Sequence, residues 1–344
     1  MASVPHTVEV AIVGAGPCGL AAAISCERAN LTTAIFDSEC VVSTITQYPT
    51  YATFFSTAEK LSLGGIPFVV ATAKPSRRDA LAYYRAVVKH FALDVRQYER
   101  VVGIAGDRGA WRVTSTPRGA AERITHVRYV VVATGYFGSP NLLRIPGEAL
   151  PHVSHRYIEG HHAFAQSVVV VGGGNSAAEA ALDLWRSGAQ VTLTHFGPTF
   201  DKKIKPWILP DLNNRIAEGS IAVRWNARVA AITAECVELR DTRDESVVRL
   251  PARHVYLLTG YAPNVDLLRA VGVPIDAASG IPAHDPATLQ TDVPGIFIAG
   301  VVVAGYDANK VFIENGRFHG DKIVACIQGT PPPDTPGVSR DLDS

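Results

Sequence analysis

Two stretches of the chain share one order of hydrophobic and polar positions. Each has a short apolar run, a glycine-rich turn, an alanine-rich segment, a polar break and a second apolar run, over residues 8–39 and 166–197. A strand, a helix and a second strand within ~30 residues form the βαβ unit of nucleotide-binding folds. The pattern therefore predicts an α/β chain with two Rossmann-type halves.

Shorter apolar runs predict further strands and helices. We expect strands at 111–117 and 124–135, around a polar turn, several more over 221–264, and another at 295–301. Helices are expected at 77–91 and 311–329. The last residues, 329–344, are rich in proline and polar side chains and predict a disordered tail.

Composition excludes several classes of protein. Lys plus Arg equals Asp plus Glu at 32 each, which gives no support for binding to nucleic acid or an anionic membrane. Apolar runs fall short of the ~20 residues of a spanning helix, and no signal peptide is expected. Five cysteines without a CxxC pair favour a cytoplasmic protein. His152, His155, His161 and His162 lack metal-ligand spacing, so no metal is predicted.

The first glycine turn has the features of a dinucleotide site. Gly14, Gly16 and Gly19 fit G-x-G-x-x-G, and Pro17 lies where a helix is expected to begin. These glycines allow a tight turn, close approach of a pyrophosphate and close packing of helix and strand. Asp37 ends the second strand, where an acid holds ribose hydroxyls. The alternative is a turn that binds nothing.

The second glycine turn, at 172–177, fits the variant G-x-G-x-x-A. Its second strand ends at His195, so no carboxylate would repel a 2′-phosphate there. Together with Lys202 and Lys203, this favours NADPH over NADH, unless the lysines belong to a solvated loop. The residues predicted to bind this nucleotide are Gly172, Gly174, Asn175, Ser176, Ala177, His195, Lys202 and Lys203.

Three short motifs extend this interpretation to a family. ATG at 133–135, TGYAP at 259–263 and GIFIAG at 295–300 resemble motifs of two-dinucleotide-binding-domain flavoproteins, and their order resembles the low-molecular-weight thioredoxin reductases. The resemblance implies FAD at the first turn, near Thr134, Gly135 and Gly300, and a homodimer. It also implies an FAD domain formed by 1–138 and 265–328, with an NADPH domain inserted at 139–264.

Longer motifs resemble a narrower group, the bacillithiol disulfide reductases of the YpdA type. These are GPCGL at 16–20, YPTYATFFSTAEKLSLGGIPF at 48–68, IKPWILP at 204–210 and NKVFIENGRFHG at 309–320. The CxxC of thioredoxin reductases is absent from 152–167, just before the second turn. The resemblance implies an oxidoreductase that uses NADPH to reduce a small-molecule disulfide such as bacillithiol disulfide.

Cys18, inside the first glycine turn, is the candidate catalytic residue. The resemblance implies that it is the thiol that exchanges with the disulfide, and the dipole of the following helix is expected to lower its pKa. The alternative is a small packing residue beside the pyrophosphate. The chain departs from thioredoxin reductases at Gly300-Val301, where they have Gly-Asp for the ribityl chain. Asp307 or a backbone N–H is the candidate substitute.

In related flavoproteins the segment holding Tyr48, Thr50, Phe54, Phe55 and Lys60 approaches the flavin ring. These side chains would then stack on the ring or line the acceptor pocket, and the alternative is core packing. The helix with Glu314 and Asn315 is also expected to face the flavin.

Three other functions stay open at this point. A ferredoxin or flavodoxin NADP⁺ oxidoreductase would use a protein electron carrier, docked on Arg77, Arg78, Arg85 and Lys89. A flavin monooxygenase is suggested by a loose match of 145–152 to F-x-G-x-x-x-H. A non-catalytic redox-sensing flavoprotein would bind both nucleotides without turnover.

Overall fold

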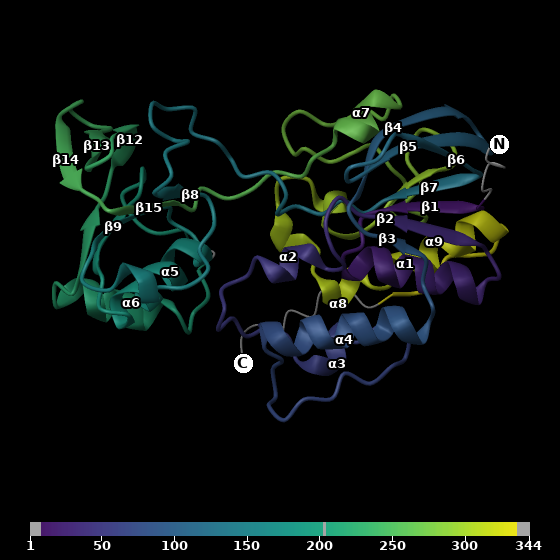
Figure 1. Cartoon of the computed structure of the whole chain (residues 1–344), viewed down its shortest axis with the longest axis horizontal. Helices are drawn as coiled ribbons and strands as arrows, with labels where there is room; N and C mark the ends of the chain where they lie inside the picture. Colours follow the sequence, from purple (N-terminus) through teal and green to yellow (C-terminus); the bar gives the residue numbers. More distant parts are fainter. Residues whose placement is uncertain (1–7, 202–203, 336–344) are drawn as a thin grey trace. The chain divides into compact units, whose positions relative to one another are not determined.

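The computed structural model describes residues 8–201 and 204–335, and these form two compact units (Figure 1). The first unit is built from residues up to 46, 52–139 and 261 onward, and the second from 47–51 and 140–260. The domain boundaries predicted from the sequence differ from these units at residues 47–51, at residue 139 and at residues 261–264. Residues 47–51 lie in the second unit because Thr50 N–H donates to Ile158 O (2.8 Å). Residues 261–264 lie in the first unit, where Ala262 N–H donates to Ser139 O (3.0 Å).

Each unit contains helices and strands with the following bounds, and 3-10 helices carry the label η. Those of the first unit are β1 (Val10–Val13), α1 (Pro17–Arg28), β2 (Thr33–Phe36), α2 (Ser43–Thr46), α3 (Ala58–Leu61), α4 (Arg77–His90), β3 (Val95–Arg96), β4 (Glu99–Asp107), β5 (Ala110–Pro117), β6 (Arg123–Val127), β7 (Tyr129–Val132), α7 (Asp266–Ala270), β16 (Ile296–Ile298), η2 (Gly300–Ala304), η3 (Ala308–Lys310), α8 (Ile313–Gly316) and α9 (His319–Gln328). Those of the second are β8 (Val153–Ser154), η1 (His161–Ala163), β9 (Ser167–Val171), α5 (Asn175–Arg186), β10 (Gln190–Thr194), α6 (Leu209–Ala217), β11 (Ile221–Arg224), β12 (Ala227–Ile232), β13 (Cys236–Asp241), β14 (Val247–Pro251) and β15 (His254–Leu257).

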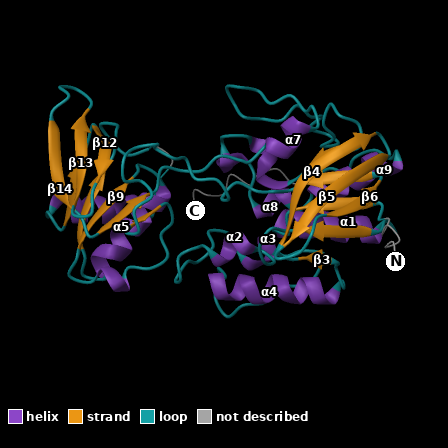
Figure 2. Ribbon diagram, turned by 45° about the horizontal axis from the view of Figure 1, so that its top comes forward, coloured by secondary structure: helices purple, strands orange, loops and turns teal. Residues whose placement is uncertain are grey.

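The first unit has three layers around a parallel sheet of order β16-β7-β1-β2-β3 (Figure 2). Ala11 and Val13 face the antiparallel sheet β4-β5-β6 and pack with Trp111 and Val113. Helix α1 follows β1 and packs closely on α9, where a Cβ at Gly320 would lie 2.6 Å from Ala22 Cα. Both predicted βαβ units are confirmed, as β1-α1-β2 and β9-α5-β10. The carboxyl ends of the parallel strands of the first unit lie along one edge of its sheet.

The second unit repeats this arrangement with a parallel sheet of order β11-β10-β9-β15-β8. Strand β9 is buried on both faces because its residues are almost all valine, as expected of a central parallel strand. Val168 and Val170 pack toward α5 and α6, whereas Val169 and Val171 pack toward the antiparallel sheet β12-β13-β14. The strand–helix–strand order of 166–197 therefore places its glycine turn at the carboxyl edge of this sheet.

The predicted strands at 111–117 and 124–135 are β5, and β6 with β7, and the predicted helix at 77–91 is α4. The single helix predicted over 311–329 is wrong, because the chain breaks between α8 and α9. At the break Arg317 Nη1 donates to the carbonyl oxygens of Glu59 (2.8 Å) and Ser62 (2.7 Å), which fastens this segment to α3.

The predicted tail begins with the end of α9, where Gly329 is left-handed (φ 70°) and Thr330 N–H donates to Ala325 O (2.9 Å). Residues 331–335 form no helix or strand, and 336–344 lie outside the described residues. In the described part of the chain, no helix is long and apolar enough to cross a membrane.

Candidate functional site

The first glycine turn is shaped by two positions that exclude any side chain. Gly14 has a φ of 115°, and a Cβ there would lie 2.3 Å from the carbonyl oxygen of Ala133. A Cβ at Gly19 would lie 2.0 Å from the carbonyl oxygen of Gly14. Gly16 differs, because a Cβ there would meet no atom within 4 Å. Two glycines thus permit the packing of α1 on β1, while the third borders open space.

The start of α1 offers hydrogen-bond donors beside that space. Gly16 is the N-cap residue and no side chain caps the helix. Pro17 has no N–H, so the amide donors of the first turn come from Cys18 and Gly19. Free amides and the positive end of a 12-residue helix suit an anion. The turn therefore fits the diphosphate of a dinucleotide.

Asp37, directly after β2, stabilises the turn itself. Its Oδ2 accepts from Ala15 N–H (2.8 Å) and its Oδ1 from Glu39 N–H (2.9 Å). Burial raises the pKa of this carboxyl above its ordinary value, against the lowering effect of the two N–H donors. Each carboxylate oxygen keeps a second lone pair, so Asp37 can still accept from a ribose hydroxyl. The sequence predicted the ribose contact and missed the structural one.

Other predicted residues of the first turn meet at the same sheet edge. Thr134 and Gly135 follow β7, and the nitrogen of Thr134 would lie 3.2 Å from a Cβ at Gly14. Thr134 Oγ1 donates to Asn264 O (3.4 Å). Gly300 follows β16 and has a φ of 72°. The structure thus brings these residues to the carboxyl ends of neighbouring parallel strands, where nucleotides bind in open α/β sheets.

Cys18 lies against two glycines. A Cβ at Gly300 would lie 3.3 Å from Cys18 Sγ, and a Cβ at Gly316, at the end of α8, only 2.6 Å from it. The side chain is half-buried, and desolvation raises the pKa of its thiol to about 12. The expectation of a lowered pKa is therefore wrong for the polypeptide itself, because burial disfavours the thiolate.

His319 is a residue of this site that the sequence did not single out. Its Nδ1 accepts from Gly300 N–H (3.0 Å), and its side chain is 8% exposed. Burial lowers the pKa of His319 to about 4, so the ring is neutral at pH 7 and its proton is assigned to Nε2. Gly300 N–H is thus already bonded and does not replace the missing Asp. The sequence does not indicate this contact, because it forms only when the fold brings the start of α9 next to the end of β16.

The predicted flavin-facing residues of α3 and α8 contact one another. Ser56 Oγ donates to Glu314, and Lys60 Nζ lies 3.9 Å from Glu314 Oε2. Asn315 Oδ1 accepts from Phe312 N–H (2.8 Å) and so stabilises the start of α8. These contacts hold α8 in place, and Gly316 of α8 lies beside Cys18.

The second glycine turn has the same packing requirement as the first. Gly172 has a φ of 149°, and a Cβ there would lie 2.5 Å from Leu258 O and 3.0 Å from Ala177 Cβ. Gly174 is the N-cap of α5, again without a side-chain cap. A Cβ at Gly174 would have Asp201 Oδ2 as its nearest neighbour, at 3.6 Å. This turn also has room for a diphosphate at the start of a helix.

His195 covers part of the second turn. Its ring is 5% exposed and lies so close to Gly173 that a Cβ there would be 2.4 Å from His195 Cε1. Its Nε2 lies 3.9 Å from Asp201 Oδ1, and its buried Nδ1 has no hydrogen-bond partner among the described residues. Burial lowers the pKa of His195 below its ordinary value, against the raising effect of Asp201. The ring is therefore neutral at pH 7.

Asp201 is the residue that the sequence missed at the second turn. Its N–H donates to Gly173 O (3.0 Å) and its carboxylate stands beside Gly174. Asn175 Oδ1 accepts from Lys205 N–H (2.8 Å), whereas Ser176 is exposed. The two predicted phosphate-binding residues that follow Asp201, Lys202 and Lys203, lie outside the described residues.

Comparison with known proteins gives consistent matches over most of the chain. The family model described as "Pyridine nucleotide-disulphide oxidoreductase" matches residues 11–300. Bacilliredoxin reductase Bdr of Bacillus subtilis (strain 168) is 41% identical over 92% of this chain and 96% of its own. The structure of bacillithiol disulfide reductase Bdr (YpdA) from Bacillus cereus has a TM-score of 0.91 at 41% identity, covering 94% of this chain and 99% of its own. Its Staphylococcus aureus counterpart has a TM-score of 0.88 at 38% identity, with coverage of 94% and 99%.

Proposed function

Because the chain belongs to the pyridine nucleotide-disulphide oxidoreductase family, we propose that it is an NADPH-dependent flavin disulfide reductase acting on bacillithiol disulfide. A flavin and a nicotinamide cofactor are implied by the family. We assign FAD to the first unit and NADPH to the second. The observation that carries the proposal is the match over nearly the full length of both chains to reductases with these names.

The residues of the first turn have distinct roles in this proposal. When bound, a flavin supplies two-electron transfer between a nicotinamide and a disulfide. The N–H groups of Cys18 and Gly19 bind the diphosphate, and the bare Gly16 lets it approach. Asp37 fixes Ala15 and accepts from a ribose hydroxyl.

His319 positions Gly300, and Gly300 in turn confines the sulfur of Cys18. We propose that Cys18 is the exchange thiol. After it loses its proton, its sulfur attacks the substrate disulfide, the S–S bond breaks and one thiolate leaves. Two electrons and two protons then release the second thiol and restore Cys18. The raised pKa means that the thiol is protonated at pH 7 in the polypeptide alone, so deprotonation has to accompany substrate binding.

The preference for NADPH rests on the end of β10. Thr194 and His195 stand there in place of the acid that binds the 2′-hydroxyl of NADH. The Asp201 carboxylate beside Gly174 acts in the opposite direction, because it repels phosphate groups. NADPH therefore remains the proposal, with Lys202 and Lys203 as its candidate phosphate ligands.

The test is NADPH oxidation without oxygen, with two acceptors in separate arms. One arm contains bacillithiol disulfide, and the other a bacilliredoxin that carries bacillithiol as a mixed disulfide, because the relatives are named for each. We expect turnover with bacillithiol disulfide that is lost in Cys18→Ala. Cys26→Ala, a buried cysteine of the same helix, is the control and should keep it.

Other outcomes of this test are equally informative. Turnover that Cys18→Ala retains would make Cys18 a packing residue and leave the reductase. Turnover only with the bacilliredoxin mixed disulfide would mean that the substrate is a protein disulfide and not bacillithiol disulfide. Electron transfer to ferredoxin or flavodoxin, without reduction of either disulfide, would overturn the proposal.

We also propose a cytoplasmic homodimer. The five cysteines, all within the described residues, form no disulfide, which suits a reducing compartment. The dimer rests on the family resemblance, and light scattering of the purified protein tests it by giving the mass in solution.

A further inference from the structure

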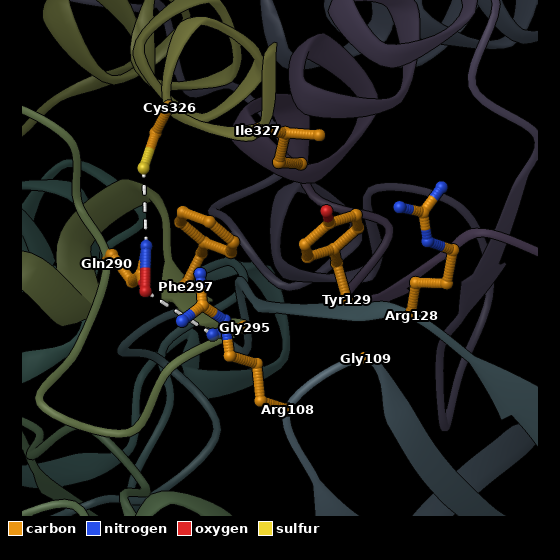
Figure 3. A pocket seen from close by; sticks show the side chains of 9 residues that line it. All are labelled: Arg108, Gly109, Arg128, Tyr129, Gln290, Gly295, Phe297, Cys326 and Ile327. Carbon is orange, nitrogen blue, oxygen red and sulfur yellow. Dashed lines mark hydrogen bonds between the residues drawn. The ribbon is translucent and has the colours of Figure 1, made fainter. Parts of the chain in front are cut away.

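A cavity of about 340 Å³ opens in the first unit, away from the glycine turn (Figure 3). It is lined by the turn between β4 and β5, the residues at the starts of β7 and β16, and the last turn of α9. Tyr129 is the first residue of β7, and Gly295 precedes β16. The glycine turn lies beyond the other ends of these same strands, ~10 Å along the sheet. The cavity is therefore separate from the site around Cys18.

Among the described residues, the cavity holds one unpaired cationic side chain, Arg108. Figure 3 shows the Arg108 side chain extending into it from the β4–β5 turn, and this guanidinium forms no hydrogen bond or ion pair with any described residue. Arg128 points away from Arg108 and lies 3.3 Å from Glu9 Oε1. Trp111 is 4% exposed, and its Nε1 has no partner in the described part of the chain. That N–H lies 2.9 Å from where a Cβ at Gly295 would be, but Trp111 itself does not line the cavity.

The cavity also contains a nucleophile, Cys326. Gln290 Oε1 accepts from Gly295 N–H (3.4 Å), and Gln290 Nε2 donates to Cys326 Sγ (3.2 Å). The Gly295 amide can only donate, so the amide oxygen of Gln290 faces it and the NH₂ group faces the sulfur. Cys326 and Arg108 thus line the same cavity.

We propose that this cavity is a site where a carboxylate-bearing low-molecular-weight disulfide forms a mixed disulfide with Cys326. A single ligand of this class matches both features, because Arg108 binds the carboxylate while the disulfide meets the sulfur. Cys326 loses its proton to solvent, and its thiolate attacks one sulfur of the ligand. A Cys326–ligand S–S bond forms, the ligand's S–S bond breaks, and the other half leaves as a thiolate. Cys326 is half-buried and lines the cavity.

The test compares two disulfide probes on the flavin-loaded protein. 5,5′-Dithiobis(2-nitrobenzoate) carries carboxylates, whereas 2,2′-dithiodipyridine is uncharged. Peptide mass spectrometry gives the labelling rate of Cys326 in wild type and in Arg108→Gln, whose position is an exposed turn. We expect Arg108→Gln to slow the carboxylate probe about three- to fivefold, as for a surface charge pair, and to leave the neutral probe within about twofold.

Arg128→Gln is the matched control, because that guanidinium already pairs with Glu9 and points away. It should keep the wild-type rates with both probes at Cys326. Cys40, half-buried elsewhere in the same unit, serves as the internal reference. Equal slowing of both probes by Arg108→Gln, equal effects of the two arginine substitutions, or no labelling of Cys326 would each overturn the proposal.

Discussion

The two glycine turns of this chain share their spacing and differ in the side chains around them. In the first, Asp37 accepts from Ala15 N–H and leaves Gly16 open. In the second, the His195 ring lies on Gly173 and the Asp201 carboxylate approaches the turn. The shared glycines determine how a helix packs on a strand. The residue after the second strand determines the surface that the turn presents to a ligand.

The largest effect should come from adding a Cβ where the first turn is closed. Gly19→Ala places this atom 2.0 Å from the Gly14 carbonyl oxygen, so α1 has to move away from β1. We expect the free energy of unfolding to fall by about 3 kcal/mol or more, measured by urea denaturation of the cofactor-free protein. Gly16→Ala enters open space and should change it by less than about 1 kcal/mol. Equal stability of the two variants would contradict this view of the turn.

His195→Ala tests the packing role of the second turn's distinctive side chain. Removing a buried ring should lower the free energy of unfolding by about 2 kcal/mol, while His195→Phe, which keeps a ring, should retain most of it. In the wild type, KM for NADPH should stay constant between about pH 6.5 and 8, because burial already lowers the pKa of His195 below that range. A KM that rises through this range would instead assign His195 to a charged phosphate contact.

Asp37→Asn should alter the pH dependence of stability at the first turn. The pKa of Asp37 is higher in the folded protein than in the unfolded chain. The Asp37 carboxyl therefore contributes its full stabilisation below its pKa in the unfolded chain, and this contribution is lost as pH rises through its pKa in the folded protein. The difference in unfolding free energy, wild type minus Asp37→Asn, should therefore decrease from pH 4 to pH 7. A difference that increases with pH would mean that the two N–H donors outweigh desolvation.

The smallest effect is expected from Asp201→Asn. This change keeps the backbone bond to Gly173 and removes one exposed negative charge near the nucleotide phosphates. We expect KM for NADPH to fall about threefold, and by less at 0.5 M salt, because the charge is screened there. An unchanged KM would place Asp201 outside the reach of the nucleotide.

Much of the fold followed from local patterns. Apolar runs and glycine spacing predicted both βαβ units, because these features determine strand, turn and helix within one short stretch. The long helix over 311–329 was predicted wrongly, because at the break Arg317 bonds to the carbonyl groups of Glu59 and Ser62, which are distant in sequence. The division of the chain at 47–51 likewise depends on a hydrogen bond to Ile158.

The candidate site was predicted less completely for the same reason. Gly14, Gly16 and Gly19 form a motif that is visible in the sequence. By contrast, the contact of His319 with Gly300 and that of Gly316 with Cys18 arise only when the C-terminal segment folds back. The expected low pKa of Cys18 followed from the helix dipole, and the burial that raises the pKa becomes visible only in the fold. Asp201 was overlooked because only its two lysine neighbours suggested phosphate binding.

The central claim is that the two similar turns bind different cofactors, and one matched pair of variants tests it. Gly16→Val and Gly174→Val each add a side chain where a Cβ has room, the nearest atom to the second being 3.6 Å away. The measurement is the flavin absorbance of each purified protein, followed by its bleaching with NADPH under anaerobic conditions. We expect Gly16→Val to lack flavin, and Gly174→Val to keep it without being bleached. Flavin retained by Gly16→Val, or lost from Gly174→Val, would contradict the assignment.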